Sequence, residues 1–175
     1  MLFRSATASG GISVVSHGVA DGGDSFTDLT ATSVIISATD DVGSLANEGV
    51  DALEINVDNL AVTSSGGDIV LFETNDASVS TVTVDVARIQ TDATATAVTD
   101  SKVGVVATTG TGQIVFNVGG ALTVTDNVEE TPAISTETGA IAVTAEELIL
   151  NDAISSQSAD VTLTINGNFS TGESS

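Results

Sequence analysis

Few side chains in this sequence could perform nucleophilic or acid–base chemistry. His17 is the only histidine, and there is no cysteine. A Ser-His-Asp triad needs its histidine beside a nucleophile and an acid, and the chain has no Gly-x-Ser-x-Gly turn to present such a serine. We therefore expect His17 to be a surface residue, and we expect no catalytic residue of this type.

Adjacent carboxylates raise the alternative of polysaccharide cleavage. The pairs are Asp40-Asp41, Glu129-Glu130 and Glu146-Glu147. A glycosidase holds two carboxyl groups facing each other about 5–10 Å apart across the sugar, whereas neighbouring residues of a strand point to opposite faces. Carboxylates from different coils of a β-helix could converge, but the chain has almost no basic or aromatic side chains to hold a sugar. A lyase or hydrolase is thus the least favoured function.

Calcium binding is the better-supported chemistry. Hard cations take several oxygen ligands, which aspartate, asparagine and backbone carbonyls provide. The segments Asp21-Gly22-Gly23-Asp24 and Asn75-Asp76 have suitable residues, so Asp21, Asp24, Asn75 and Asp76 are the candidate ligands. Neither an EF-hand loop nor the Gly-Gly-x-Gly-x-Asp repeat is present. Solvated acidic turns are therefore the default interpretation of these segments and we expect no cofactor, with calcium as the one alternative that the residue types allow.

The charge of the chain excludes several partners. Three Lys and Arg residues stand against 24 Asp and Glu residues, for a formal net charge of −21. Binding to nucleic acid or to an anionic membrane surface requires cations that this chain lacks. No apolar run approaches the roughly 20 residues of a membrane helix, so we expect no membrane insertion. Without cysteine, stability must come from burial and backbone pairing.

The elements that must position any site are β-strands. Val, Ile, Leu, Ala and Thr dominate, and the aromatic residues, 3% of the chain, are all Phe. β-Branched side chains favour strands over helices. Apolar and polar residues alternate with period two at 53–58, 82–86 and 161–165, and Gly-rich turns separate these segments. The composition and the alternation together predict an all-β fold.

A degenerate repeat organises these strands. The layout small–polar–Ile/Val–x–apolar begins at Gly67, Gly112, Gly139 and Ala159, at separations of 45, 27 and 20 residues. We expect the first gap to contain one further copy around residues 82–89. A second short strand follows two of the starts, at 120–124 and 147–150, and we interpret the helix-like run 145–150 as a strand entered through a turn. The pattern predicts a β-solenoid with coils of about 20–27 residues.

The side-chain sizes agree with a narrow coil. Stacked Val, Ile, Leu and Ala would fill its interior, while Thr, Asp, Asn and Glu would face water. The chain has no Trp or Tyr, which commonly anchor the wider core of a β-sandwich. Several short strands at regular spacing nevertheless fit a sandwich, which remains the structural alternative.

The repeat style resembles that of a known group. Residues 51–62 running into 65–71, and the run from 138 through 148–150 to 159–163, are similar to repeat arrays of giant secreted bacterial surface proteins. These are the filamentous-haemagglutinin-like adhesins and autotransporter passenger domains. The resemblance covers roughly residues 50–170. It implies a right-handed parallel β-helix on the cell surface that serves as a stalk or adhesive fibre.

These observations lead to one set of expectations. We expect residues 1–175 to form a single β-solenoid segment, less regular over 1–30, excerpted from a longer repeat array. Its function would be structural and adhesive, without catalysis, in an extracellular or cell-surface protein. A calcium-dependent binding or matrix module is the alternative. The partners would be glycans or proteins of a host or neighbouring-cell surface or matrix, together with end-to-end self-association through open strand edges.

Overall fold

The computed structural model describes residues 5–46, 51–89, 92–108, 110–125 and 131–172, and every regular element within these ranges is a strand. The strands are β1 (Ala6–Thr7), β2 (Gly11–Ser16), β3 (Leu29–Ala38), β4 (Leu53–Ser64), β5 (Ile69–Glu73), β6 (Ala77–Val79), β7 (Thr81–Ile89), β8 (Ala95–Val103), β9 (Val105–Ala107), β10 (Ile114–Val118), β11 (Ala121–Val124), β12 (Ile134–Thr136), β13 (Ile141–Ala145), β14 (Glu147–Leu150), β15 (Ile154–Ser156), β16 (Val161–Ile165) and β17 (Phe169–Thr171). This described part contains no helix long and apolar enough to cross a membrane.

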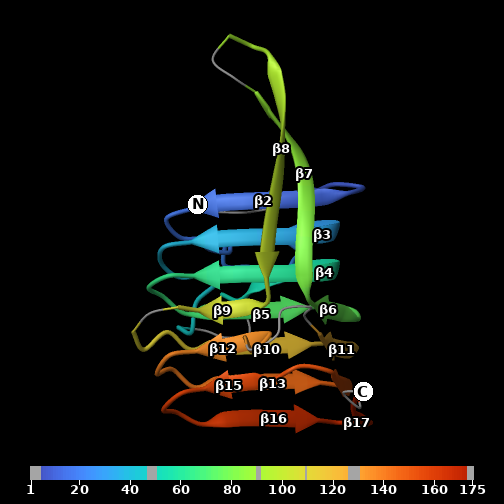
Figure 1. The fold of residues 1–175 in the computed structure, drawn as a ribbon. Coiled ribbons are helices and arrows are strands. Elements are labelled where there is room, and N and C mark those ends of the chain that lie inside the picture. The colour runs from blue at the N-terminus through green and yellow to red at the C-terminus, as the bar shows by residue number, and fades with distance from the viewer. Residues whose placement is uncertain (1–4, 47–50, 90–91, 109, 126–130, 173–175) are drawn as a thin grey trace.

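Strands from successive coils stack on one another. Fifteen strands form one sheet whose pairs are parallel, and the stack runs from β2 at one end to β16 and β17 at the other (Figure 1). Among the described residues, the only antiparallel pair is β7 with β8. The fold is therefore all-β and parallel, as in a β-solenoid, and the two antiparallel layers of a β-sandwich are not found in the described ranges.

The repeat starts identified in the sequence coincide with the register of the sheet. Ile69 pairs with Ile114, Ile114 with Ile141, and Ile141 with Val161. The second short strands also stack, because Leu122 of β11 lies on Leu148 of β14. The sequence pattern thus marked equivalent positions of neighbouring coils, and the run 145–150 is extended, as expected.

Branched and aromatic side chains fill the interior in columns. Leu71, Phe116 and Val143 are register neighbours, and all three are buried. Because parallel strands lie about 4.8 Å apart, each side chain in a column contacts those of the coils above and below. One continuous cluster of buried apolar residues results, running from Val14 near one end of the stack to Leu148 near the other.

The expectation of a further coil around residues 82–89 is wrong. That segment is β7, which pairs with β8 as an antiparallel hairpin outside the main sheet. Its alternation of buried Val82 and Val84 with exposed Thr83 and Asp85 is real. The valines, however, pack on the outer surface of the stack. An alternation with period two does not show whether the apolar face of a strand packs in the core or on the outer surface of the stack.

The hairpin covers an apolar patch on the outside of the stack. Ile35 of β3 and Ala61 of β4 point away from the core and form a second buried cluster with Val82 and Val84. Gly11 of β2 leaves room for this packing, because a Cβ there would lie 2.4 Å from Val84 Cγ1. Figure 1 shows the hairpin crossing β2, β3 and β4 and extending beyond the β2 end of the stack.

Aspartates in the turns connect successive coils. Asp41 Oδ1 accepts a hydrogen bond from Asp68 N at 2.8 Å, and Asp68 Oδ1 accepts one from Gln113 N at 2.8 Å. A carboxylate bonded to a backbone N–H makes a charge-assisted hydrogen bond. Part of the acidic content is therefore structural, holding each turn on the next.

Candidate metal centre

Three carboxylates converge where the regular coil is interrupted. Asp21 lies in the loop of residues 20–28, and Asp28 ends this loop immediately before β3. Glu54 is the second residue of β4. Leu29 pairs with Ile55 and both are buried in the core, so the residues before them, Asp28 and Glu54, point to the opposite, outer side. The register of two coils therefore places these two acids side by side.

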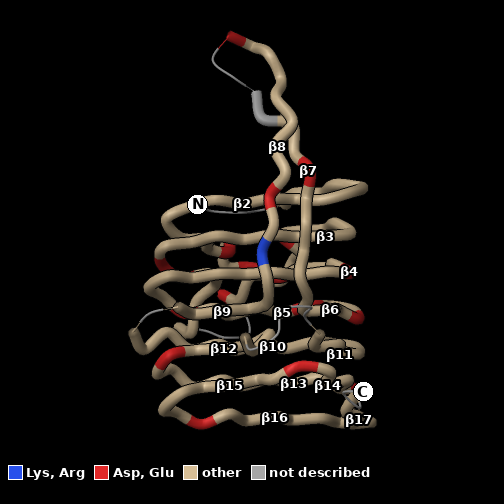
Figure 2. Tube along the Cα trace, viewed as in Figure 1, with Lys and Arg blue, Asp and Glu red and all other residues tan. Residues whose placement is uncertain are grey.

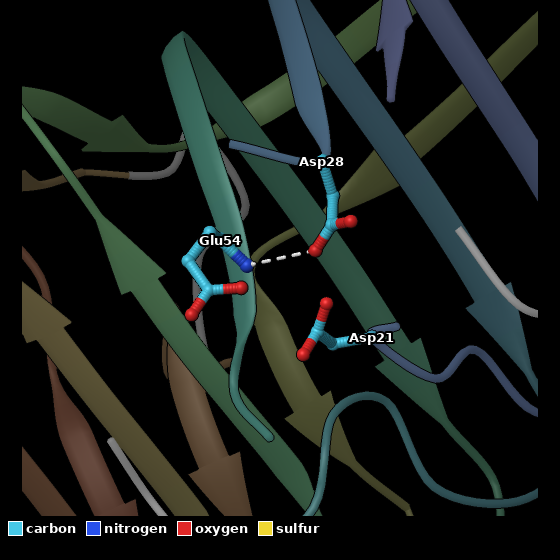
Figure 3. A group of neighbouring side chains, drawn as sticks. All are labelled: Asp21, Asp28 and Glu54. Carbon is cyan, nitrogen blue, oxygen red and sulfur yellow. Dashed lines mark hydrogen bonds between the residues drawn. The ribbon is translucent and has the colours of Figure 1, made fainter. Parts of the chain in front are cut away.

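The three side chains, hereafter the carboxylate cluster, lie close enough to share one ion. One ligand oxygen from each of Asp21, Asp28 and Glu54 lies within 4.8 Å of the other two. Figure 3 shows the three carboxylates turned toward one another, with the Glu54 backbone N donating to Asp28 Oδ2 at 3.3 Å. Asp28 is 1% exposed and Glu54 is 4% exposed, while Asp21 is half-buried.

Two oxygens of the carboxylate cluster are buried without a hydrogen-bond partner. They are Asp21 Oδ1 and Glu54 Oε2. The other Asp21 oxygen, Oδ2, accepts hydrogen bonds from Gly23 N at 2.7 Å and Asp24 N at 3.2 Å, which fixes the carboxylate at the turn. Buried polar atoms nearly always have a hydrogen-bond partner. The cluster therefore differs from the turn aspartates described above, whose carboxylates accept hydrogen bonds from backbone N–H groups.

The electrostatics of the carboxylate cluster disfavour its charged state. Burial, followed by the charge of Asp21, raises the pKa of Asp28 to about 6. Burial and the charges of Asp21 and Asp28 raise the pKa of Glu54 to about 7. No Lys, Arg or His side chain of the described residues forms an ion pair with the cluster. Lys102 on β8 is the only described lysine or arginine side chain, against many acidic residues (Figure 2). A proton or a cation is needed to offset this repulsion.

Of the four ligand candidates from the sequence, one lies in the carboxylate cluster and three lie outside it. Asp21 belongs to the carboxylate cluster. Asp24 does not; its backbone N bonds Asp21, and its own Oδ1 accepts from Phe26 N at 2.9 Å. Asn75 and Asp76 lie in another turn, where Asp76 Oδ1 accepts from Ala121 N at 2.7 Å. These last two residues take part in hydrogen bonds between coils and lie outside the carboxylate cluster.

Asp28 and Glu54 were missed in the sequence. The alternation of residues 53–58 places Glu54 on the polar face, and we expected that face to contact water; for Glu54 this is wrong, because its side chain is buried beside Asp21 and Asp28. The signal that points to both residues is the register of the two coils. Aligning Leu29 with Ile55 puts two acids next to each other on neighbouring coils.

Within the described ranges, the remaining His, Asp and Glu residues form no second group of three close ligand atoms. His17 is exposed, and its Nδ1 lies 3.5 Å from Asp40 Oδ2. Glu73 is fully buried, and its two oxygens accept hydrogen bonds from Val57 N at 2.9 Å and Asn75 N at 3.0 Å. Burial raises the pKa of Glu73 to about 7 despite these bonds. Of the carboxylate doublets, Glu129-Glu130 lies outside the described residues.

Fold and site together define a protein class: an all-β, parallel, β-solenoid-like chain with a buried carboxylate cluster beside an inserted loop. Comparison with family models, with curated proteins and with solved structures finds no match. The function must therefore be argued from this chain's own geometry.

Proposed function

We propose that this chain is a structural and adhesive module of a secreted or cell-surface bacterial protein, with no catalytic activity. In this proposal the stack is a right-handed β-helix, since parallel crossover connections are right-handed in nearly all cases. Its coils span about 20–27 residues, in keeping with the 27 residues from Ile114 to Ile141 and the 20 from Ile141 to Val161. Each coil lengthens the stack by about 4.8 Å.

The main support is the continuous register of the core. Ile69, Ile114, Ile141 and Val161 occupy equivalent positions in successive coils, and the buried cluster runs through the stack. Repeated coils of this kind add length to a protein, because each unit stacks only on its neighbours. The outer surface is then free to present side chains to a glycan or protein partner.

The surface depressions give little support to an enzyme. A depression of about 310 Å³ beside β9, β12 and β15 includes Ser135, Gln157 and a single carboxylate, Glu137. A second one, of about 380 Å³, includes Asp58 and Asp76, and Asp76 is already bonded to a backbone N–H. The carboxylate cluster has three acids, but two of them are buried away from any sugar chain. A polysaccharide lyase or hydrolase would need convergent acids that its substrate can reach.

The experiment that tests this proposal is labelling of intact cells that produce the chain. Antibodies against the chain should bind unpermeabilised cells, and external protease should remove the signal. Labelling that appears only after permeabilisation contradicts a surface role. Incubation of the purified chain with acidic and neutral polysaccharides should leave their length unchanged, and shortened products would contradict the absence of catalysis.

A further inference from the structure

We propose that Asp21, Asp28 and Glu54 bind one calcium ion, which fastens the loop of residues 20–28 to β4 in the neighbouring coil. The proposal rests on three convergent carboxylates and on a second, independent observation. Glu54 is 4% exposed, yet its Oε2 has no hydrogen-bond partner and its carboxylate is turned toward the other two acids (Figure 3). The inference goes beyond the structural role, because a stack of coils needs no ion.

The dimensions fit calcium. Calcium–oxygen distances of about 2.3–2.6 Å place two ligands on opposite sides of the ion about 5 Å apart. The three ligand oxygens lie within 4.8 Å of one another, so they can surround a calcium ion with small adjustments. Magnesium requires an octahedron at about 2.0–2.1 Å and gives up its waters reluctantly, which fits less well with half-buried and buried carboxylates. Water molecules would complete the calcium shell.

The charges also favour a cation. Like charges side by side on neighbouring strands destabilise a sheet. Asp28, immediately before β3, lies beside Glu54 on β4 in the same way, with Asp21 close to both. A divalent ion reverses the sign of these interactions and supplies the missing partner of Glu54 Oε2 and Asp21 Oδ1. The alternative occupant is a proton shared among the carboxylates, which would leave the cluster indifferent to calcium.

Binding would join two points of the loop to the neighbouring coil. Asp21 represents the inserted loop, Asp28 the entry to β3, and Glu54 the following coil. Without the ion, the loop is held beside β4 by the hydrogen bonds at Asp28, namely Asp28 N to Glu54 O at 2.7 Å and Glu54 N to Asp28 Oδ2 at 3.3 Å. The ion would add a direct connection and make the stability of these coils depend on calcium concentration.

Calorimetric titration of the chelator-treated full chain with calcium chloride in 150 mM sodium chloride tests the proposal. We expect one ion per chain with a dissociation constant of about 10⁻⁴–10⁻³ M or tighter, the range of extracellular calcium modules. Magnesium chloride should bind at least tenfold more weakly. No saturable heat with calcium, or equal affinity for the two ions, overturns the proposal.

The Glu54→Gln variant separates a specific site from general attraction to an acidic protein. It removes one ligand and one repulsive charge. It should therefore unfold at a higher temperature than the unsubstituted chain in chelator and gain nothing from calcium. The matched control is Asp58→Asn, which removes an exposed carboxylate of the same strand and should keep the full calcium response. An undiminished calcium response in Glu54→Gln contradicts the site. Unfolding is followed by circular dichroism, because the chain lacks Trp and Tyr.

Discussion

Asp28 and Glu54 stand on neighbouring coils, each one residue before the paired core residues Leu29 and Ile55, with their carboxylates on the same outer side of the sheet. Backbone pairing forces the two acids together, since Asp28 N donates to Glu54 O at 2.7 Å. A sheet cannot separate them without losing its register. Two carboxylates held this close repel each other when both are charged. The arrangement therefore favours protonation of the carboxyls or binding of a cation.

The ion-free protein should lose stability as the pH rises from about 5 to about 8. Burial raises the pKa of Asp28 from 3.8 to about 6, and burial raises the pKa values of Glu54 and Glu73 from 4.5 to about 7. The folded state therefore binds more protons than the unfolded state in this window, and the free energy of unfolding falls as these protons leave.

We expect this decrease to be on the order of 2 kcal/mol, less than full shifts at about 1.4 kcal/mol per unit would give, because local relaxation and water penetration reduce the cost of burying a charge. Thermal unfolding in chelator at several pH values measures it. Glu54→Gln should show a shallower pH dependence than the unsubstituted chain. Stability that rises between pH 5 and pH 8 would show that these carboxyls are not held in the protonated form.

Calcium should protect the loop of residues 20–28 from chymotrypsin, which cleaves after large aromatic residues. Phe26 in this loop is 74% exposed. If cleavage requires the loop to leave the stack, calcium at ten times its dissociation constant should slow it about tenfold. Phe169 on β17, 55% exposed and outside the loop, provides an internal control whose cleavage should not respond to calcium. Mass spectrometry of the fragments distinguishes the two sites, and equal rates at Phe26 with and without calcium contradict the prediction.

Val84→Asp should release the hairpin from the outer face of the stack. Val84 is buried against Ile35 and Ala61, and a carboxylate placed there without a partner costs about 2–3 kcal/mol. Hydrogen exchange of β7 and β8 should accelerate while exchange in β10 and β13 stays slow. Ala87→Asp places the same charge at an exposed position of β7 and should leave the exchange unchanged. If Val84→Asp unfolds the whole chain, the hairpin is part of the main cooperative unit.

The parallel stack could be predicted from the sequence because its signals are local. The layout beginning at Gly67, Gly112, Gly139 and Ala159 recurs at the starts of β5, β10, β13 and β16, and neighbouring copies pair in register. The hairpin could not be recognised in the same way, since β7 has the same alternation as a core strand. The outward burial of Ile35, in the apolar run Val34-Ile35-Ile36, was the available sign that something covers that face.

The candidate site could be predicted only in part. Acidic residues near glycines pointed to Asp21, which lies in the carboxylate cluster, but equally to Asp24, Asn75 and Asp76, which lie outside it, because turn aspartates that bond backbone N–H groups have the same local sequence. Glu54 lies 33 residues from Asp21 and within a regular strand. Its role follows from the alignment of two coils, which a degenerate repeat does not define in this less regular part of the chain.

The β16 edge should associate with other copies as salt rises. Val161 and Leu163 continue buried columns but are each 38% exposed, and in the described residues no strand pairs with the far side of β16. A net charge of −21 opposes contact at low salt, and screening weakens this repulsion. Sedimentation velocity should show oligomers at about 1 M salt.

The edge variant Leu163→Glu should reduce this association. Thr162→Glu, which adds the same charge on the outward side of β16, is its control and should reduce it less. A chain that remains monomeric at every salt concentration contradicts an adhesive edge.

The most direct test of the stacked coils is a cross-link between two engineered cysteines, in a chain that has none of its own. Val115 and Ala142 are register partners on adjacent strands and are partly exposed. The spacing of about 4.8 Å between strands suits a disulfide. Val115→Cys combined with Ala142→Cys should form an intramolecular disulfide under mild oxidation. Val115→Cys with Thr144→Cys, displaced two residues along the strand, should not, since the Cα atoms would be more than about 7 Å apart. Equal cross-linking of both pairs, or none in the first, would contradict the parallel in-register stack on which the proposed function depends.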